Sequence, residues 1–320
     1  MTYRFNVAAR AVAAFFVVGA SAMSAQAESF VMATGSQGGS WFPVGGAIKA
    51  AVEKARPDIS ITVTPGAGIA NVVGVDTGRF PIGFANSIST VDGQKGRAPF
   101  REATEGVCNL GVLYPQYFQI IALDSAEINS VEDFAGKRLT TQQNGHTGEL
   151  LTRAALEALG LSYDDLDDVS HVSYSDSASM MKDGHADVFT LGTAMPAGAV
   201  MDIASSRDID VVGVSEELFE TFKAQNAAFQ MREVPAGAYP GVDEPKQAIT
   251  YDTHMVADCE FDGEIVKAVL SGVLDNLESM GSINKAMADL TAEDMAADIG
   301  VPMHPAAKEF YEERGVSFGG

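Results

Sequence analysis

Two glycine-rich segments hold the residue types best suited to binding a small ligand. The first segment, TGSQGGS (34–40), is followed at once by the only tryptophan of the chain and contributes Gly35, Ser36, Gly39, Ser40 and Trp41. The second segment, QNGHTG (143–148), contributes Gln143, Gly145, His146, Thr147 and Gly148. Glycine lets a ligand approach the backbone, and the N–H groups of a helix that starts after such a turn attract anions. The pair predicts a site for a small molecule with two acidic or polar ends.

A second interpretation of both segments is that they are only tight turns. Under that interpretation Trp41 packs in a core and His146 faces solvent, whereas a binding site places Trp41 in a pocket wall. The sequence alone leaves this choice open.

The surrounding elements would place the two segments in equivalent positions. Each segment lies between a β-rich run and a helical pattern: 29–35 and 43–55 around the first, 137–142 and 149–160 around the second. Each unit continues into further buried strands, which are predicted at 59–65 and 80–86, and at 170–175 and 186–192. Repeated strand–helix units predict parallel sheets with helices on both faces.

The rest of the chain is predicted more coarsely. Residues 105–114 form an irregular stretch before the apolar run 117–125, and residues 247–257 form a long strand. The tail beyond residue 263 shows helical periodicity. A chain of 320 residues exceeds the usual size of about 100–200 residues per domain, so we expect two α/β lobes.

The N-terminal segment is typical of a secretion signal. Arg4 and Arg10 precede and flank the apolar run AVAAFFVVGASA, and Ala25-Gln26-Ala27 fits cleavage after Ala27. The competing interpretation, a membrane anchor, needs roughly 20 apolar residues, and this run is shorter. We therefore expect residues 1–27 to be removed and the remaining chain to be located in the periplasm, with no stable membrane insertion.

The net charge of −22 excludes some classes of partner. Such a surface repels nucleic acid and anionic lipid headgroups. An anionic small ligand remains compatible with it, because exposed charges are screened over about 8 Å and a pocket's own donors dominate inside it.

Neither metal nor enzyme chemistry is indicated by the motifs. Cys108 and Cys259 have no histidine or cysteine at ligand spacing, and the sequence leaves open whether they form a disulfide or are separately buried. The chain lacks H-E-x-x-H and G-x-S-x-G, and its first loop is neither a dinucleotide fingerprint nor a P-loop. We expect no catalytic residues, no bound metal and no cofactor.

An ordered set of segments resembles the TAXI-type solute-binding proteins of TRAP transporters. The segments are MATGSQGGSWFPVGGAI, PGAGIANVVGVDTGRFPIGFANS, FAGKRLTTQQNGHTGELLTRAALEALGL, DGHADVFTLGTAMP, AGAYPG and VPMHPAAKEFYEERG. The resemblance implies a type II periplasmic-binding-protein fold with a ligand cleft between two lobes. The implied lobes are a discontinuous lobe I (28–116 and 236–320) and lobe II (117–235).

The resemblance also implies particular ligand contacts. Besides the two glycine-rich loops it points to Asn71, which follows PGAGIA, and to Asn86 and Ser87, which follow the third strand. Two positions depart from the family pattern. Its T-G-G-S-x-x-N reads PGAGIAN here, with Gly68 in place of serine, and its G-S-G-T reads GHTG.

The resulting expectation is a monomeric receptor that captures a small organic anion and delivers it to TRAP membrane permease subunits. A glutamate-like amino acid or a C4–C5 dicarboxylate such as 2-oxoglutarate is the implied ligand class. The alternatives are an exported enzyme that acts on a small acid in the same cleft, and a periplasmic sensor module.

Overall fold

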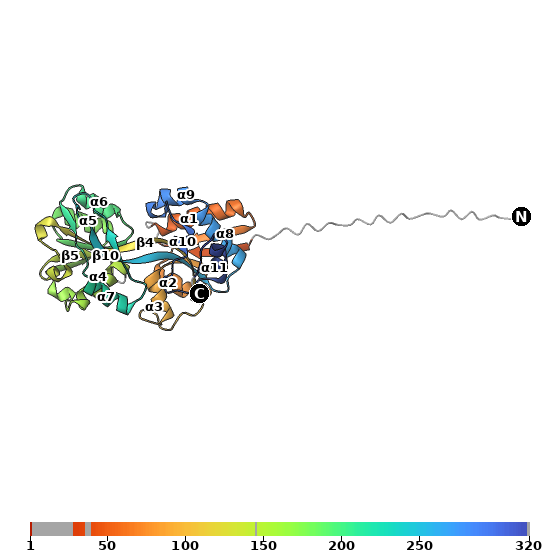
Figure 1. Cartoon of the computed structure of the whole chain (residues 1–320), viewed down its shortest axis with the longest axis horizontal. Helices are drawn as coiled ribbons and strands as arrows, with labels where there is room; N and C mark the ends of the chain where they lie inside the picture. Colours follow the sequence, from red (N-terminus) through yellow and green to blue (C-terminus); the bar gives the residue numbers. More distant parts are fainter. Residues whose placement is uncertain (2–27, 36–39, 145, 319–320) are drawn as a thin grey trace.

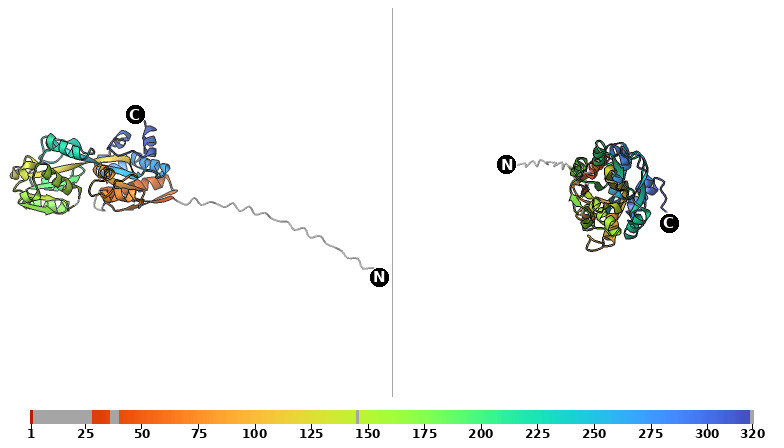
Figure 2. Two further views of the ribbon diagram at one scale, coloured as in Figure 1. Left: turned by 90° about the horizontal axis from the view of Figure 1, so that it is seen from below. Right: turned by 90° about the vertical axis from the view of Figure 1, so that its left-hand side faces the viewer.

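Two long strands, β4 (Val107–Leu123) and β10 (Lys246–Asp258), run as an antiparallel pair through both lobes of the protein. The computed structural model describes residues 1, 28–35, 40–144 and 146–318. Figures 1 and 2 show the two lobes lying side by side along the long axis, with these strands passing between them. The signal segment predicted at 1–27 lies, apart from Met1, outside the described residues.

Lobe I contains both ends of the described fold. Its strands are β1 (Glu28–Ala33), β2 (Ile59–Thr64) and β3 (Ile82–Asn86). Its helices are α1 (Trp41–Ala55), α2 (Gly68–Asp76), α3 (Ser87–Gln94), α8 (Gly263–Leu274), α9 (Leu277–Ile283), α10 (Ala292–Met295) and α11 (Pro305–Glu312). Apolar side chains of α1, α8 and α11 pack on the strands and form the main core of this lobe.

Lobe II is built from the middle of the chain. Its strands are β5 (Arg138–Thr141), β6 (Asp168–His171), β7 (Val188–Thr193), β8 (Ile209–Val211) and β9 (Gln230–Val234). Its helices are α4 (Thr147–Ala158), α5 (Tyr174–Asp183), α6 (Gly198–Ala204) and α7 (Glu216–Gln225). Short 3-10 turns occupy Asp124–Ala126, Val131–Phe134, Tyr163–Asp165 and Lys285–Met287.

A single hydrogen-bonded sheet of ten strands joins the lobes in the part of the chain that the structure describes. Its order is β2-β1-β3-β10-β4-β7-β5-β6, with β8 paired to β4 and β9 paired to β10. The neighbours β1, β2 and β3 are parallel, as are β5, β6 and β7, whereas β4 and β10 run antiparallel to their partners. The predicted fold class, a type II periplasmic-binding-protein fold with two α/β lobes, is therefore confirmed.

The predicted irregular stretch at 105–114 is wrong. Residues 107–114 and the apolar run as far as Leu123 belong to one strand of 17 residues, β4. Pro115 separates the two runs in the sequence, and a proline usually argues against a central strand because it cannot donate to the ladder. Here Pro115 faces Asp252 of β10 and the strand continues through it.

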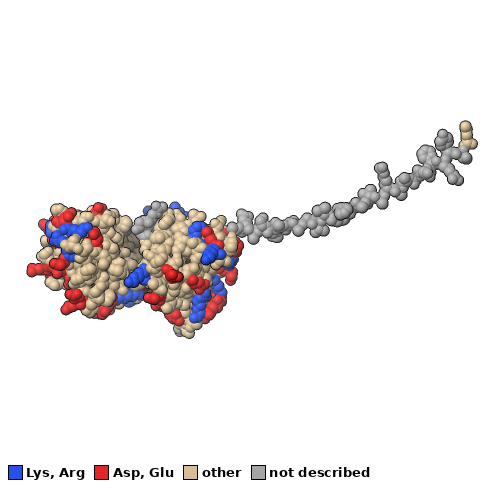
Figure 3. All heavy atoms as spheres, turned by 90° about the horizontal axis from the view of Figure 1, so that it is seen from above, with Lys and Arg blue, Asp and Glu red and all other residues tan. Residues whose placement is uncertain are grey.

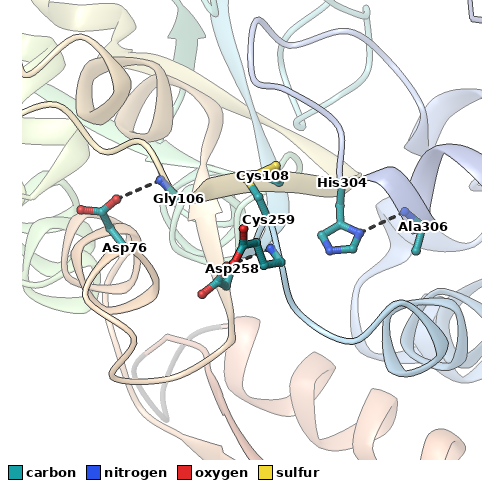
Figure 4. Close-up of a disulfide and its surroundings, with 8 residues drawn as sticks. Asp76, Gly106, Cys108, Asp258, Cys259, His304 and Ala306 are labelled. Atoms are coloured by element: carbon teal, nitrogen blue, oxygen red, sulfur yellow. Dashed lines mark hydrogen bonds between the residues drawn. A yellow bond between two sulfur atoms is a disulfide. The ribbon is translucent and has the colours of Figure 1, made fainter.

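The cysteines close this strand pair at the lobe I end. Cys108 near the start of β4 and Cys259 just after β10 form a disulfide (Figure 4). Beside it the N–H of Cys259 donates to the carbonyl of Gly106 over 2.9 Å, and the N–H of Gly106 donates to a carboxylate oxygen of Asp76 over 3.2 Å. The disulfide links positions 151 residues apart, so it fixes the first crossing strand to the second.

Charge is distributed over the outer surface of both lobes. Figure 3 shows acidic side chains exposed on each lobe, with basic ones between them. Among the described residues, none of the helices combines the length and the apolar character that a bilayer crossing requires.

Candidate ligand-binding site

A cavity of about 530 Å³ lies between the two lobes. Its walls come from the loops that follow β1, β2, β3 and β5, together with the middle of β4 and the C-terminal end of β7. Ligands of open α/β folds bind outside the carboxyl ends of the strands, which is where these loops lie. The lining residues are Gly35, Ser40, Trp41, Gly66, Ala67, Gly68, Ile69, Ala70, Asn86, Ser89, Gln116, Gln142, His146, Thr147, Gly192 and Thr193.

Helix starts converge on this cavity. Among the described residues, α1, α2, α3 and α4 all begin beside it, and their N-cap residues are Ser40, Ala67, Asn86 and His146. None of these four N-caps makes a side-chain capping hydrogen bond. The first N–H groups of a helix have no intrahelical acceptor and carry the positive end of its dipole. The site therefore offers an anion several positive helix ends at once.

The described lining also contains no charged side chain. No Asp, Glu, Lys or Arg is found among the cavity residues that the structure describes, although the chain as a whole has a net charge of −22. A carboxylate side chain in the wall would repel an anion strongly in a site with little water. Its absence from these residues leaves helix ends and neutral donors to set the local potential.

Trp41 and Ser40 are held in place by lobe I. The indole Nε1 donates to Oγ1 of Thr253 over 3.3 Å, and the ring lies edge-on to Phe84. Oγ of Ser40 is 2.9 Å from the hydroxyl of Tyr114. A methyl group on Gly35 would lie only 3.0 Å from Cβ of Trp41, so a larger residue here would press on the tryptophan. The predicted pocket wall and the predicted turn glycine thus lie together in the cavity.

Asn86 connects the cavity wall to both lobes. Nε2 of Gln116 donates to Oδ1 of Asn86 over 3.1 Å and to Oγ1 of Thr253 over 2.6 Å. Nδ2 of Asn86 in turn donates to Oγ1 of Thr147 over 3.3 Å. These bonds link β3, β4 and β10 to the first residue of α4 in the other lobe.

The second glycine-rich loop contributes a closely packed helix start. The N–H of Gly148 donates to Oε1 of Gln142 over 2.6 Å. A methyl group on Gly148 would lie 2.8 Å from the backbone nitrogen of Gly192, so α4 can pack against β7 here only through glycine. His146 is exposed and lines the cavity rim, whereas Gln143 is exposed and is not part of the described lining.

Two residues predicted as ligand contacts lie behind the cavity wall. Asn71 is 1% exposed, and its amide donates to the carbonyls of Thr34 over 2.7 Å and Phe84 over 2.8 Å. Ser87 is fully buried, and its Oγ accepts the N–H of Asp252 over 3.0 Å. Both side chains hold strands and loops together, and neither belongs to the cavity lining.

Other predicted residues fall outside the description or away from the site. Ser36, Gly39 and Gly145 lie outside the described residues. Arg153, about one helical turn beyond the second loop, forms an ion pair with Glu149 over 3.3 Å and does not line the cavity, so it is not placed to neutralise a bound anion there.

Several lining residues were missed by sequence reasoning. Gln116 follows Pro115 inside a buried strand. A polar amide side chain within this largely apolar strand was the one signal in the sequence that could have identified it as a site residue. Gln142 immediately precedes the predicted loop. The backbone of 66–70 gave no side-chain signal, because these residues are glycine, alanine and isoleucine and contribute through the start of α2. Ser89 and Thr193 resemble ordinary polar positions in the sequence.

Comparison with known proteins identifies the fold and the family. A TctC solute-binding protein from Polaromonas superimposes with a TM-score of 0.52 at 15% sequence identity, covering 90% of this chain and 97% of that one. The periplasmic aliphatic sulphonate binding protein SsuA from Escherichia coli aligns with a TM-score of 0.49 at 15% identity, covering 89% and 78%. At 15% identity the likeness to the TctC protein concerns the fold alone. The sequence matches the NMT1-like family over residues 32–315, nearly the whole described fold, and the chain therefore belongs to the NMT1-like family.

Proposed function

We propose that this protein is the extracytoplasmic solute-binding receptor of a TRAP transporter of the TAXI type. It captures a small organic anion between its lobes and delivers it to the membrane permease subunits. The observation that carries the proposal is the convergence of four helix starts on an interlobe cavity whose described lining has no charged side chain. None of the four N-cap residues makes a side-chain capping hydrogen bond, although at α4 the N–H of Gly148 donates to Gln142. The two lobes, the crossing strands and the order of the family segments support it.

The proposed ligand class is the one that the family resemblance implies, and the same geometry is compatible with it. A glutamate-like amino acid or a C4–C5 dicarboxylate such as 2-oxoglutarate has an anionic group at each end. One end is placed at the starts of α1 and α2 in lobe I, and the other at the start of α4 in lobe II. Only a ligand that touches both lobes favours their closure over an open form.

The remaining parts of the proposal concern the whole chain. Residues 1–27 direct export to the periplasm and are removed, residues 28–116 with 236–320 form lobe I, and residues 117–235 form lobe II. The receptor acts as a monomer and is not an enzyme. An ion gradient rather than ATP drives the permease.

Thermal melting of the exported protein in the presence of a ligand panel tests the proposal. Glutamate, 2-oxoglutarate or succinate should raise the melting temperature by several degrees, because a ligand that binds only the folded state stabilises it. Glucose serves as the uncharged comparison. A rise with the uncharged solute and with none of the acids would contradict the anion site.

A pair of glycine substitutions makes this test specific to the cavity. Gly68 and Gly198 are each the first residue of a helix and each follows an alanine N-cap, but only Gly68 lines the cavity. A Cβ on Gly68 would have its nearest neighbour at 3.5 Å, and one on Gly198 would have none within 4 Å. Gly68→Asp should lower affinity for an acid at least tenfold through charge repulsion, whereas Gly198→Asp should leave it unchanged.

The exported-enzyme alternative has its own readout. A receptor takes up ligand stoichiometrically and returns it unchanged, whereas an enzyme converts it. Mass spectrometry of the acid after prolonged incubation with the protein distinguishes the two. Uptake into vesicles that contain the permease, with an ion gradient and without ATP, separates a transport receptor from a sensor module.

A further inference from the structure

A second cavity of about 380 Å³ lies beside the ligand-binding cavity, again between the lobes. We call it the apolar chamber. Its lobe I wall includes Ile69 and Phe100, and its lobe II wall includes Leu150, Leu151, Ala154 and Phe222. The lobe II residues lie on one face of α4 and on α7, which pack against each other across the chamber wall.

The apolar chamber adjoins the ligand-binding cavity. Ile69, Ser89 and Thr147 line both spaces. Thr147 is the first residue of α4, so the helix that begins at the anion site continues directly along the chamber. A molecule bound by its acidic group at this helix start therefore lies next to the chamber, with these shared residues between the two spaces.

Three polar side chains at the chamber wall, Asp92, Arg97 and Asn226, are bonded to one another or to backbone carbonyls across the lobes. Nδ2 of Asn226 donates to the carbonyl of Ile88 and to Oδ1 of Asp92, each over 2.9 Å. Arg97 forms an ion pair with Asp92 over 3.3 Å and donates to the carbonyl of Gln225. Because these donors and acceptors bind one another, the surface left to a ligand is mainly hydrocarbon.

We infer that the ligand carries an apolar substituent that occupies the apolar chamber while its acidic group binds in the adjoining cavity. This inference rests on the proposed receptor for a small organic anion, and it adds an apolar substituent to the acidic group that the proposed ligand already carries. Branched aliphatic or aromatic groups match a chamber bounded by isoleucine, leucine and phenylalanine. Apolar surface removed from water contributes favourably in proportion to its area, so such a group adds affinity that a compact acid lacks.

A series of 2-oxo acids with one shared head group tests the inference. The probes are pyruvate, 2-oxobutanoate, 2-oxopentanoate and 4-methyl-2-oxopentanoate, with 2-oxoglutarate as the compact dicarboxylate. Calorimetry gives the dissociation constants, and fluorescence of Trp41, the only tryptophan in the chain, gives an independent signal from the cavity wall. Affinity should rise about fourfold for each methylene that enters the chamber.

Ala154→Phe fills the chamber with a ring and should abolish this dependence on chain length while leaving pyruvate affinity within about twofold. Ala158→Phe is the matched control, because Ala158 lies on the same helix, is exposed and does not line the chamber. Leu150→Ser makes the chamber wall polar without adding volume and should flatten the dependence as well. It replaces Ala154→Phe as the decisive variant if the added ring prevents folding.

The outcomes separate the two proposals. Binding of pyruvate or 2-oxoglutarate with no gain along the series overturns the chamber inference and leaves the receptor proposal standing. The same holds if Ala154→Phe and Leu150→Ser both retain the wild-type gain. Failure of every acid in the series and in the broader panel removes both proposals.

Discussion

Asn86 at the end of β3 in lobe I donates a hydrogen bond from Nδ2 to Oγ1 of Thr147 at the start of α4 in lobe II, over 3.3 Å. The donor is buried and is oriented by Gln116, and the acceptor is one of the three residues that line both the ligand-binding cavity and the apolar chamber. The bond exists only while the lobes are in contact at the cleft. Its strength is therefore part of the balance between closed and open forms.

Thr147→Val removes the acceptor of this bond and keeps the shape of the side chain. We expect the unliganded protein to open more often and its ligand affinity to fall about 2- to 10-fold, because a net hydrogen bond contributes about 0.5–1.5 kcal/mol. Small-angle scattering measures the opening and calorimetry the affinity. Thr221→Val on the exposed side of α7 is the control. An unchanged radius of gyration together with unchanged affinity would show that the bond contributes nothing to closure.

Asn71→Ala should act mainly on stability. It leaves the buried carbonyls of Thr34 and Phe84 without the amide that they bind now. Each unsatisfied buried group costs about 1–3 kcal/mol, so the free energy of unfolding should fall by at least that amount in urea titration. Asn129→Ala, at an exposed position, should have little effect. A variant of normal stability with lost affinity would instead place this amide on the ligand.

His254 makes stability dependent on pH. It is fully buried between Oγ1 of Thr90 and Oδ1 of Asn109, and burial lowers its pKa to about 3. Between that value and the unfolded pKa of 6.5, the unfolded chain binds a proton that the folded chain does not. Stability contributed by this group is therefore lost as pH falls below 6.5, by about 2 kcal/mol between pH 7 and pH 5.

His254→Gln tests this prediction through the change of the unfolding free energy with pH, and not through its value at a single pH. Urea unfolding at pH 7, 6 and 5 should show a shallower loss of stability in the variant than in the wild type. His185→Gln, an exposed histidine, should keep the wild-type slope. Parallel pH profiles for His254→Gln and the wild type would mean that His254 titrates normally.

The disulfide should contribute a large share of stability, because it closes a loop spanning 151 residues in the unfolded chain. The double variant Cys108→Ser with Cys259→Ser should lose about 2–5 kcal/mol of unfolding free energy. Wild-type protein unfolded in the presence of a reductant should show a comparable loss. Identical urea midpoints with and without the bond would argue that the unfolded chain already holds these segments together.

The alternating order of strands and helices in both lobes was predictable, because each element has a strong periodic pattern of apolar residues. The helix predicted at 43–55 corresponds to α1, and the strand predicted at 247–257 corresponds to β10. The continuity of β4 was not predictable, because Pro115 interrupts the apolar pattern while the long partner strand holds the backbone extended through it.

The candidate site was predictable where it depends on side chains in turns and not where it depends on backbone. Gly35, Ser40, Trp41, Asn86, His146 and Thr147 all lie in the cavity lining. The start of α2 could not be predicted as part of the site, because the alanine and glycine residues there contribute only backbone N–H groups. Asn71 illustrates the opposite case: a polar residue beside the site whose donors bind buried carbonyls.

The two crossing strands differ along their length in how firmly they are held. Their register shifts between Thr253 and His254 and again between Met255 and Val256, and bulges of this kind let a ribbon bend and twist locally. The disulfide pins one end of the ribbon, next to the bulges, whereas the other end merges into the sheet of lobe II. The strand pair is thus fixed at its lobe I end, and its irregularities lie next to Thr253, which binds the cavity residues Trp41 and Gln116.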